Sequence, residues 1–245
     1  MQASDLKVKI FADGADLNSM IELYRNPLVQ GYTTNPTLMR KAGVEDYPEF
    51  AKNVLQHIQD RPISFEVFAD DLEGMEQQAK EIASWGEQVV VKIPFMNTRG
   101  VSTAPLVRKL ADAGMRVNVT AMMTIGQVDE ILPALKNAPS SYISIFAGRI
   151  ADTGRDPIPL MKEALSRLSA YPNVELIWAS PREVLNIFQA DSIGCHVITV
   201  TENLLKKLSL TDKDLSQFSL ETVQMFYQDA CRAGFSLNLD AVATL

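Results

Sequence analysis

The sequence predicts an α/β protein whose strands close into an eight-stranded parallel barrel, the (β/α)8 or TIM-barrel fold. Its length of 245 residues matches the roughly 250 residues that such a barrel occupies as one domain. Eight β-rich runs alternate with helical patterns, as expected of βα units around a parallel sheet. No GxGxxG or GxxxxGK[ST] turn is present, although an open doubly wound sheet normally carries one after a strand. The closed barrel is therefore preferred.

Short runs rich in β-branched residues are the predicted strands. In chain order they are Val8–Asp13, Gly31–Asn35, Ile63–Ala69, Val89–Pro94, Arg116–Met122, Tyr142–Ala147, Val174–Ser180 and Ser192–Thr201. Helical spacing of apolar residues, with polar residues on the opposite face, indicates helices between them. The clearest are Gly74–Trp85, Ala104–Ala113, Ile125–Leu135 and Ile158–Ala170. Gly114, Pro62 and Pro172 mark helix ends.

A further segment follows the eighth strand, so we expect one barrel domain over residues 1–245 with a helical tail at 211–245. Thr211-Asp212-Lys213-Asp214 resembles a capping box that opens a segment running to about Phe235. The apolar residues of this tail are Val223, Phe226, Tyr227 and Phe235. They need a surface to cover, either the barrel mouth or a neighbouring subunit. We expect core packing of each one, and a homo-oligomer.

Composition and charge argue against several classes of function. The formal net charge of −7 repels phosphate, so nucleic acid is not an expected partner and an anionic ligand needs local arginines. No apolar run approaches the roughly 20 residues of a membrane span. The start, Met1 to Asp5, lacks the basic and apolar regions of a signal peptide. We therefore expect no membrane partner and a cytoplasmic location.

The sequence has few histidines and cysteines that could bind a metal or act in catalysis. Only His57 and His196 supply imidazole, the first in a polar helical stretch and the second in a predicted strand. Cys195 and Cys231 lie on different predicted elements without CxxC or Cys/His spacing. We expect neither a metal site nor a redox role.

Lys92 is the first candidate for chemistry. Catalytic groups of α/β barrels lie at the carboxyl ends of the strands. Lys92 stands in the later half of the strongly apolar run Val89–Pro94, so it must reach the barrel mouth or be buried with a partner. A snorkelling lysine at a strand end is the alternative. We favour a nucleophile, because a buried lysine more readily supplies the neutral amine that attacks a carbonyl.

Polar side chains also stand near the ends of the neighbouring strands. They are Asp13, Asn35, Glu66, Lys92, Asn118, Thr120 and Ser144. Asn118 and Thr120 share one face of their strand, because side chains two residues apart point the same way. Ser144 and Phe146 likewise share a face. Each group alone could be hydrogen-bonded to backbone only, but their arrival from successive strand ends predicts one pocket around an amine.

Two arginines follow the later strands. Arg149 comes after the sixth strand, and Arg182 follows Ser180 at the end of the seventh, where phosphate sites of such barrels are frequently built. Either could instead be a surface charge. Their placement in a protein of negative net charge favours a phosphate clamp.

Five short motifs occur in a fixed order along the chain. They are Thr33-Thr34-Asn35-Pro36, Val91-Lys92-Ile93-Pro94, Asn118-Val119-Thr120, Ser144-Ile145-Phe146-Ala147-Gly148-Arg149-Ile150 and Ala179-Ser180-Pro181-Arg182. In this order they resemble the TTNP, Schiff-base lysine, N-[VL]-T, SPFVGRI and ASFR motifs of the transaldolase family in its shorter bacterial form. The resemblance extends from about Val8 to Leu208.

The resemblance implies a role for each candidate. Lys92 would form a Schiff base with a ketose carbonyl, whose iminium is the electron sink, so neither metal nor organic cofactor is needed. Asp13 would take the proton from the sugar hydroxyl next to the bond that breaks. Glu66, through a water with Thr120, would move protons as the carbinolamine forms and collapses. Substrate contacts would come from Asn35, Asn118, Ser144, Phe146 and Ser180, and phosphate contacts from Arg149 and Arg182.

The resemblance also ranks the possible reactions. The leading hypothesis is a transaldolase of the pentose phosphate pathway that moves dihydroxyacetone from fructose 6-phosphate or sedoheptulose 7-phosphate to an aldose phosphate such as erythrose 4-phosphate. Fructose-6-phosphate aldolases are similar, but tend to carry Gln at the position of Glu66 and Tyr at that of Phe146, so this sequence favours transfer over cleavage. A third possibility is a non-catalytic sugar-phosphate-binding barrel, but binding alone would not require a buried lysine.

Overall fold

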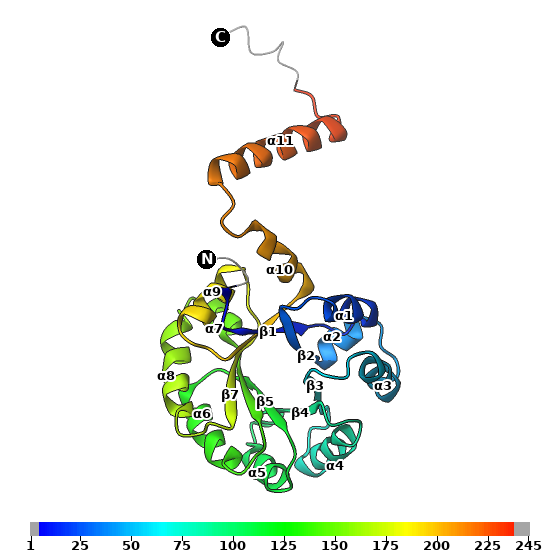
Figure 1. The fold of residues 1–245 in the computed structure, drawn as a ribbon, viewed down its shortest axis with the longest axis vertical. Helices are drawn as coiled ribbons and strands as arrows, with labels where there is room; N and C mark the ends of the chain where they lie inside the picture. Colours follow the sequence, from blue (N-terminus) through cyan, green and yellow to red (C-terminus); the bar gives the residue numbers. More distant parts are fainter. Residues whose placement is uncertain (1–4, 238–245) are drawn as a thin grey trace.

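A ring of eight parallel strands forms the centre of the computed structural model, which describes residues 5–237 (Figure 1). Neighbours in sequence are neighbours in the sheet, and β8 pairs back with β1, so the barrel is closed. The strands are β1 (Lys9–Asp13), β2 (Val29–Thr33), β3 (Ile63–Glu66), β4 (Val89–Pro94), β5 (Val117–Met122), β6 (Ser141–Ile145), β7 (Val174–Trp178) and β8 (Val197–Val200). The predicted (β/α)8 fold is confirmed.

Helices α1 to α9 connect the strands and surround the barrel, whereas α10 and α11 follow the last strand. The helices are α1 (Leu17–Tyr24), α2 (Pro36–Lys41), α3 (Tyr47–His57), α4 (Leu72–Ala83), α5 (Ala104–Asp112), α6 (Ile125–Ile131), α7 (Ala147–Asp152), α8 (Ile158–Leu168), α9 (Leu185–Ser192), α10 (Glu202–Lys206) and α11 (Leu215–Ala233), with 3-10 turns η2 (Leu132–Leu135) and η3 (Lys207–Leu210). Several begin at a short polar side chain that accepts a hydrogen bond from the first turn, such as Asp16, Asp71 and Thr124. No helix among residues 5–237 is both long enough and apolar enough to cross a membrane.

The barrel interior is filled by side chains in layers. One layer consists of Phe11, Val90, Tyr142, Ile177 and Val197. The ring of Phe11 also occupies the space beside Gly31, where a Cβ would lie 2.6 Å from it. Two residues further along the same strands, pointing the same way, come Asp13, Lys92, Ser144, Ala179 and Thr199. The apolar layer is therefore a floor, and the polar layer above it faces the carboxyl ends of the strands.

Most strand boundaries differ from the prediction by a few residues; the third strand, for example, ends at Glu66 and not at Ala69. Asn35 does not close β2 but caps α2, and its side chain accepts a hydrogen bond from the Leu38 N–H at 3.0 Å. The sixth strand ends at Ile145, because Phe146 and Ala147 turn into α7. The eighth strand does not begin at Ser192, which ends α9; its first residue is Val197.

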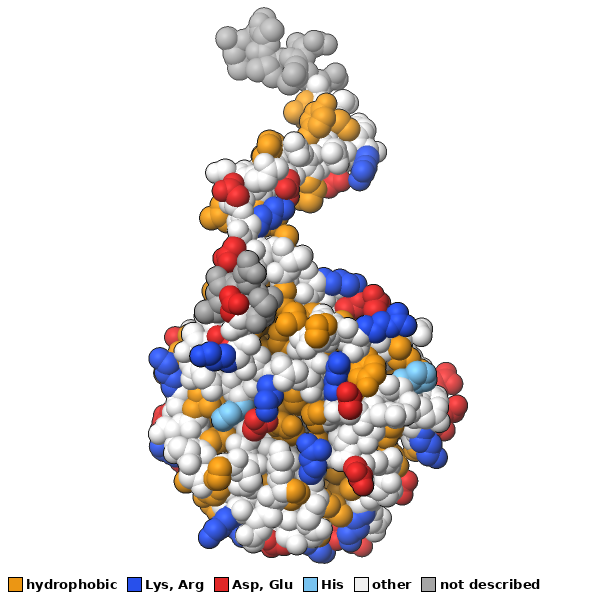
Figure 2. Space-filling model, in the orientation of Figure 1, with side chains coloured by type: hydrophobic (Ala, Val, Ile, Leu, Met, Phe, Trp, Pro, Cys, Tyr) orange, Lys and Arg blue, Asp and Glu red, His pale blue; other side chains and the backbone are white. Residues whose placement is uncertain are grey.

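The predicted tail helix exists, but its cap and its packing were predicted wrongly. Asp214, and not Thr211, caps α11 by accepting a hydrogen bond from the Gln217 N–H at 2.8 Å. Figure 1 shows α11 standing clear of the barrel beyond α10, and none of its residues is buried. The apolar tail residues expected in a core are exposed: Val223 by 59%, Phe226 by 62%, Tyr227 by 72% and Phe235 by 81%. Hydrophobic side chains are visible along this helix in Figure 2.

Candidate active site

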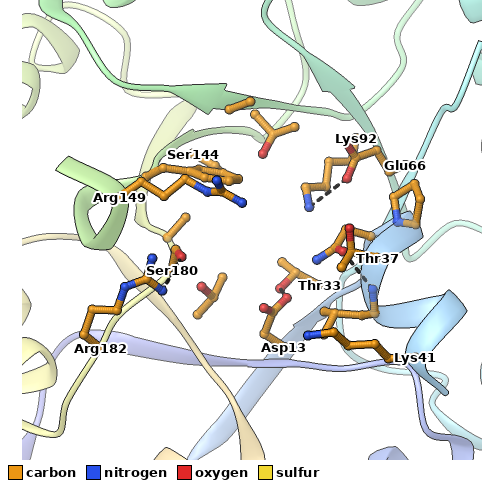
Figure 3. Close-up of a pocket in the computed structure, with 18 residues that line it drawn as sticks. Asp13, Thr33, Thr37, Lys41, Glu66, Lys92, Ser144, Arg149, Ser180 and Arg182 are labelled. Carbon is orange, nitrogen blue, oxygen red and sulfur yellow. Dashed lines mark hydrogen bonds and ion pairs between the residues drawn. The ribbon is translucent and has the colours of Figure 1, made fainter. Parts of the chain in front are cut away.

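A cavity of about 540 Å³ opens at the carboxyl ends of the strands (Figure 3). Its size is in the range of small-molecule sites. Its lining includes ten of the eleven predicted site residues: Asp13, Asn35, Glu66, Lys92, Thr120, Ser144, Phe146, Arg149, Ser180 and Arg182. Asn118 does not line the cavity but contacts Ser144, which does. The structure thus brings together groups from five strands and from the segments that follow β2, β6 and β7.

Lys92 is buried, with 5% of its surface exposed. Its Nζ lies 3.0 Å from Oε2 of Glu66 and donates a hydrogen bond of 2.9 Å to the Thr34 carbonyl. Sheet register explains the pairing, since Glu66 and Lys92 are direct partners across β3 and β4. The amine is therefore held by two acceptors while it faces the cavity, as a nucleophile requires.

Glu66 is fixed from behind by an aromatic cluster. Its backbone carbonyl accepts a hydrogen bond of 3.0 Å from the Tyr47 hydroxyl. The Tyr47 ring packs against Phe65, Phe68 and Trp85, with centroid distances of 6.2, 5.9 and 5.4 Å. The Glu66 carboxylate is only partly buried, with 16% of the side chain exposed. This exposure leaves room for the carboxylate to reach a water or a substrate hydroxyl in the cavity.

Asp13 is the second carboxyl group of the cavity. Its Oδ1 accepts a hydrogen bond of 2.7 Å from the Thr33 hydroxyl, its register partner on β2. Burial raises the pKa of Asp13 above its ordinary value, and the Lys92 charge and the Thr33 hydrogen bond only partly oppose this effect. A carboxylate whose proton affinity is raised in this way is suited to act as a general base.

Hydroxyl and amide groups form a network on the next strands. The Ser144 hydroxyl donates to Oδ1 of Asn118 at 2.7 Å, and Nδ2 of Asn118 donates to the Ser64 hydroxyl at 3.1 Å. Asn118 is fully buried and orients Ser144, which lines the cavity. The Thr120 hydroxyl is buried without a hydrogen-bond partner among residues 5–237. Because an unpaired buried hydroxyl is costly, Thr120 is available to a ligand.

The two arginines lie on one side of the cavity (Figure 3). Arg149, on α7, has its guanidinium carbon 5.7 Å from the centre of the Phe146 ring. Arg182 donates from Nε to Oδ1 of Asp152 at 2.9 Å, makes a second contact with Oδ2, and donates to the Ser180 hydroxyl at 3.0 Å. This pairing lowers the pKa of Asp152. Arg182 is thus held in place by Asp152 and Ser180, whereas the Arg149 guanidinium donates no hydrogen bond within the described chain.

Ser180 and Gly148 fix the position of both arginines. Ser180 has a left-handed backbone, with φ of 62°, which is strained for a residue other than glycine. A Cβ at Gly148 would lie 1.6 Å from the Ser180 carbonyl oxygen. The start of α7 can therefore contact the loop after β7 only because residue 148 has no side chain.

We expect Gly148→Ala to destabilise the protein by about 2–4 kcal/mol, because the conflict is with backbone and no side chain can move to relieve it. Urea unfolding measures this change. Gly126→Ala in α6 is the matched control, since the nearest atom there, Oγ1 of Thr124, would be 4.0 Å from the new Cβ and alanine favours helix. Equal stability of the two variants would contradict the proposed close approach at Gly148.

Several lining residues were not predicted from the sequence. They include Thr33, Thr37, Lys41, Ala121 and Thr199. Strand parity could have found two of them, since Thr199 stands two residues after the floor residue Val197 and Thr33 two after Gly31. Ala121 reaches the cavity through a β5 irregularity with φ of 62°, and Lys41 reaches it from a helix. Neither of these placements has a strand-end signal.

The cavity contains two amines, those of Lys92 inside it and Lys41 at its mouth, together with two carboxyl groups, several hydroxyls and two arginines. Within residues 5–237, no group of three or more His, Cys, Asp or Glu side chains could hold a metal ion. An amine beside a carboxylate, with a second carboxylate nearby, can form an imine with a carbonyl compound and shuttle the protons that this requires.

Comparisons with known proteins identify a family. Residues 10–245 match the family model described as "Transaldolase/Fructose-6-phosphate aldolase". A "Probable transaldolase" of Methanococcus maripaludis strain C5 is 36% identical over 215 residues, which cover 86% of this chain and 95% of that protein. Another "Probable transaldolase", of Thermoanaerobacter sp. strain X514, is 34% identical with the same coverage.

Solved structures with a similar fold are more distant in sequence. A dihydrodipicolinate synthase family protein from Coccidioides immitis has a TM-score of 0.52 at 13% identity, with 78% of this chain and 66% of that chain covered. A mandelate oxidase mutant has a TM-score of 0.54 at 13% identity, with coverage of 79% and 65%. This likeness shows the barrel fold alone.

Proposed function

Because the chain belongs to the transaldolase/fructose-6-phosphate aldolase family, we propose that it is a transaldolase that transfers a dihydroxyacetone unit between sugar phosphates through a Schiff base on Lys92. The observation that carries the proposal is the buried Lys92 amine, 3.0 Å from Glu66, in a cavity that also contains Asp13 and two arginines. The donor would be fructose 6-phosphate or sedoheptulose 7-phosphate and the acceptor an aldose phosphate, as in the pentose phosphate pathway.

The proposed reaction begins with attack of the Lys92 amine on the C2 carbonyl of the ketose. Glu66, through a water held by Thr120, protonates the carbinolamine hydroxyl, which leaves as water and yields the iminium. Asp13 removes the proton of the C4 hydroxyl, the C3–C4 bond breaks, and its electron pair moves into the iminium to give an enamine. The aldose phosphate leaves, and C3 of the enamine attacks the carbonyl carbon of an acceptor aldehyde, whose oxygen takes the proton back from Asp13. Hydrolysis of the new iminium frees the product ketose and the Lys92 amine.

Substrate orientation follows from the remaining groups. Asn35 and Ser144 would bind the dihydroxyacetone hydroxyls directly. Asn118 would contribute by holding Ser144 in place. Ser180 and the two arginines would hold the terminal phosphate by charge-assisted hydrogen bonds. Arg149 and Arg182 supply local positive charge in a protein whose net charge is −7.

Transfer is favoured over release of dihydroxyacetone because the ring beside the cavity is Phe146. A phenol at this position could protonate the enamine, whereas a phenyl ring has no proton to give. Cleavage of the fructose-6-phosphate aldolase type is the second candidate function, and it would need another proton donor.

The test is borohydride trapping with fructose 6-phosphate, followed by mass spectrometry of the labelled peptide. Turnover is measured with and without erythrose 4-phosphate. We expect a dihydroxyacetone adduct on Lys92 and turnover that requires the acceptor. Turnover without acceptor would reassign the chain to cleavage, and failure of every ketose phosphate tried to give an adduct would contradict both candidates.

We also propose that the protein is a homo-oligomer in which α11 packs against a second copy of the chain. Leu215, Val223, Phe226 and Tyr227 of this helix are 79, 59, 62 and 72% exposed. An exposed apolar helix face of this kind marks an interaction surface, and α11 stands apart from its own barrel (Figure 1).

Phe226→Asp should therefore shift the molar mass in solution toward the monomer, because it places a charge in the helix face that would be buried between subunits. Light scattering coupled to size exclusion measures the mass. Gln224→Asp is the matched control, as it adds the same charge at an exposed polar position of the same helix. An unchanged mass in both variants would exclude α11 from the subunit contact.

A further inference from the structure

The active-site cavity has a cationic side chain that the family motifs do not include. Lys41, the last residue of α2, lines the cavity together with Thr37. Residues four apart on a helix lie on the same face, so an ammonium and a hydroxyl group line the cavity from the same face of α2. Figure 3 shows these two side chains on the wall opposite Arg149 and Arg182, with Asp13 between the two sides.

The wall of the cavity formed by Arg149 and Arg182, here called the arginine side, offers limited free positive charge on its own. Arg182 is bound to Asp152 through both carboxylate oxygens, so much of its charge is already balanced. Arg149 is not engaged in this way. A phosphate monoester carries about 1.5 to 2 negative charges at neutral pH, which calls for a second cation.

Lys41 meets this requirement. It makes no ion pair or hydrogen bond with any residue between 5 and 237, and it is exposed at the cavity mouth. Its ammonium group and the Arg149 guanidinium each lack an acceptor among the described residues, 5–237. Both can therefore turn toward a common anion in the cavity between them.

We propose that Lys41 and Thr37 form the second half of the phosphate site, so that the phosphate of a sugar phosphate is held between α2 and the arginine side. The identity of the ligand as a sugar phosphate rests on the proposed function, whereas the binding of phosphate does not. Lys41 donates to the phosphate oxygens and takes no part in the bond changes at Lys92. It determines specificity for phosphorylated over unphosphorylated substrates.

Titration of inorganic phosphate, followed by calorimetry without any turnover, tests the site itself. Lys41→Met is expected to weaken phosphate binding by about fivefold to tenfold, the effect of one charge-assisted contact, and Lys41→Arg to retain most of it. Arg40→Met is the matched control. It removes the same charge one residue away, but Arg40 lines a separate depression with Met39 and Val44. Equal phosphate affinity in Lys41→Met and Arg40→Met would overturn the proposal.

Kinetics test the role in substrate choice. Lys41→Met should raise KM for fructose 6-phosphate by the same factor, while kcat, and kcat/KM for unphosphorylated fructose, stay unchanged. Equal losses with both sugars would overturn the specificity role. If the wild-type protein turns over no ketose phosphate, the proposed function fails, and the phosphate titration still decides whether Lys41 belongs to an anion site.

Discussion

Lys92→Met should lower turnover by at least about 10⁴-fold, because no other group can form the covalent intermediate. The only amine described within the cavity besides Lys92 is that of Lys41 at the mouth, and Lys92 alone contacts Glu66, at 3.0 Å. The measurement is the initial rate of transfer from fructose 6-phosphate to erythrose 4-phosphate. Borohydride trapping should then give no adduct at residue 92.

Two controls separate chemistry from folding. Methionine has a similar shape, and Glu66 is partly exposed and can be hydrated, so circular dichroism should show an intact barrel in Lys92→Met. Lys92→Arg keeps a positive charge beside Glu66 but cannot form an imine, so it should be equally inactive. Lys162→Met, on the exposed side of α8, should retain full activity. Normal turnover in Lys92→Met would refute the proposed mechanism.

Strand-based reasoning could predict most of this site because a parallel barrel has a simple geometry. The period of two places Asp13 above Phe11, Lys92 above Val90 and Ser144 above Tyr142, and every strand ends at the same rim. The apolar residues of each strand indicate the floor, and the first polar residue beyond them indicates the cavity. These placements depend only on local sequence.

Other parts of the site depend on contacts that no local pattern contains. Asp152 reaches Arg182 across 30 residues, and the pair forms only because Gly148 allows α7 to approach Ser180. Lys41 belongs to the short helix α2. This helix lies at the mouth of the cavity only because the strands around it close into a barrel. Asn35 looked like the end of a strand because it follows β-branched residues, but its side chain caps α2.

The tail shows a different limit of sequence reasoning. Apolar residues at helical spacing predict a covered face, and α11 has this pattern from Leu215 to Ala233. The pattern is the same whether the cover is the chain's own core or another subunit. The expectation of core packing was wrong because the choice between these depends on where the helix leaves the barrel.

Asp13→Asn should lower the rate of carbon–carbon bond cleavage by about 10²–10⁴-fold, the usual contribution of a positioned general base. Asparagine has nearly the same shape and can still accept the Thr33 hydrogen bond, but it cannot take the proton of the C4 hydroxyl. Formation of the Schiff base does not need this group. The variant should therefore still form a borohydride-trapped adduct on Lys92 that retains the full ketose phosphate.

The pH dependence gives an independent test of the same residue. Asp13 acts only when ionised, and burial raises its pKa, so activity in the wild-type protein should fall as the pH drops through a value above the ordinary carboxyl range. Thr33→Val removes a hydrogen bond that favours the ionised form and should move this acid limb to higher pH. In Asp13→Asn the limb should be absent from the residual activity. An acid limb that stays in place in both variants would assign the titration, and the role of the base, to another group.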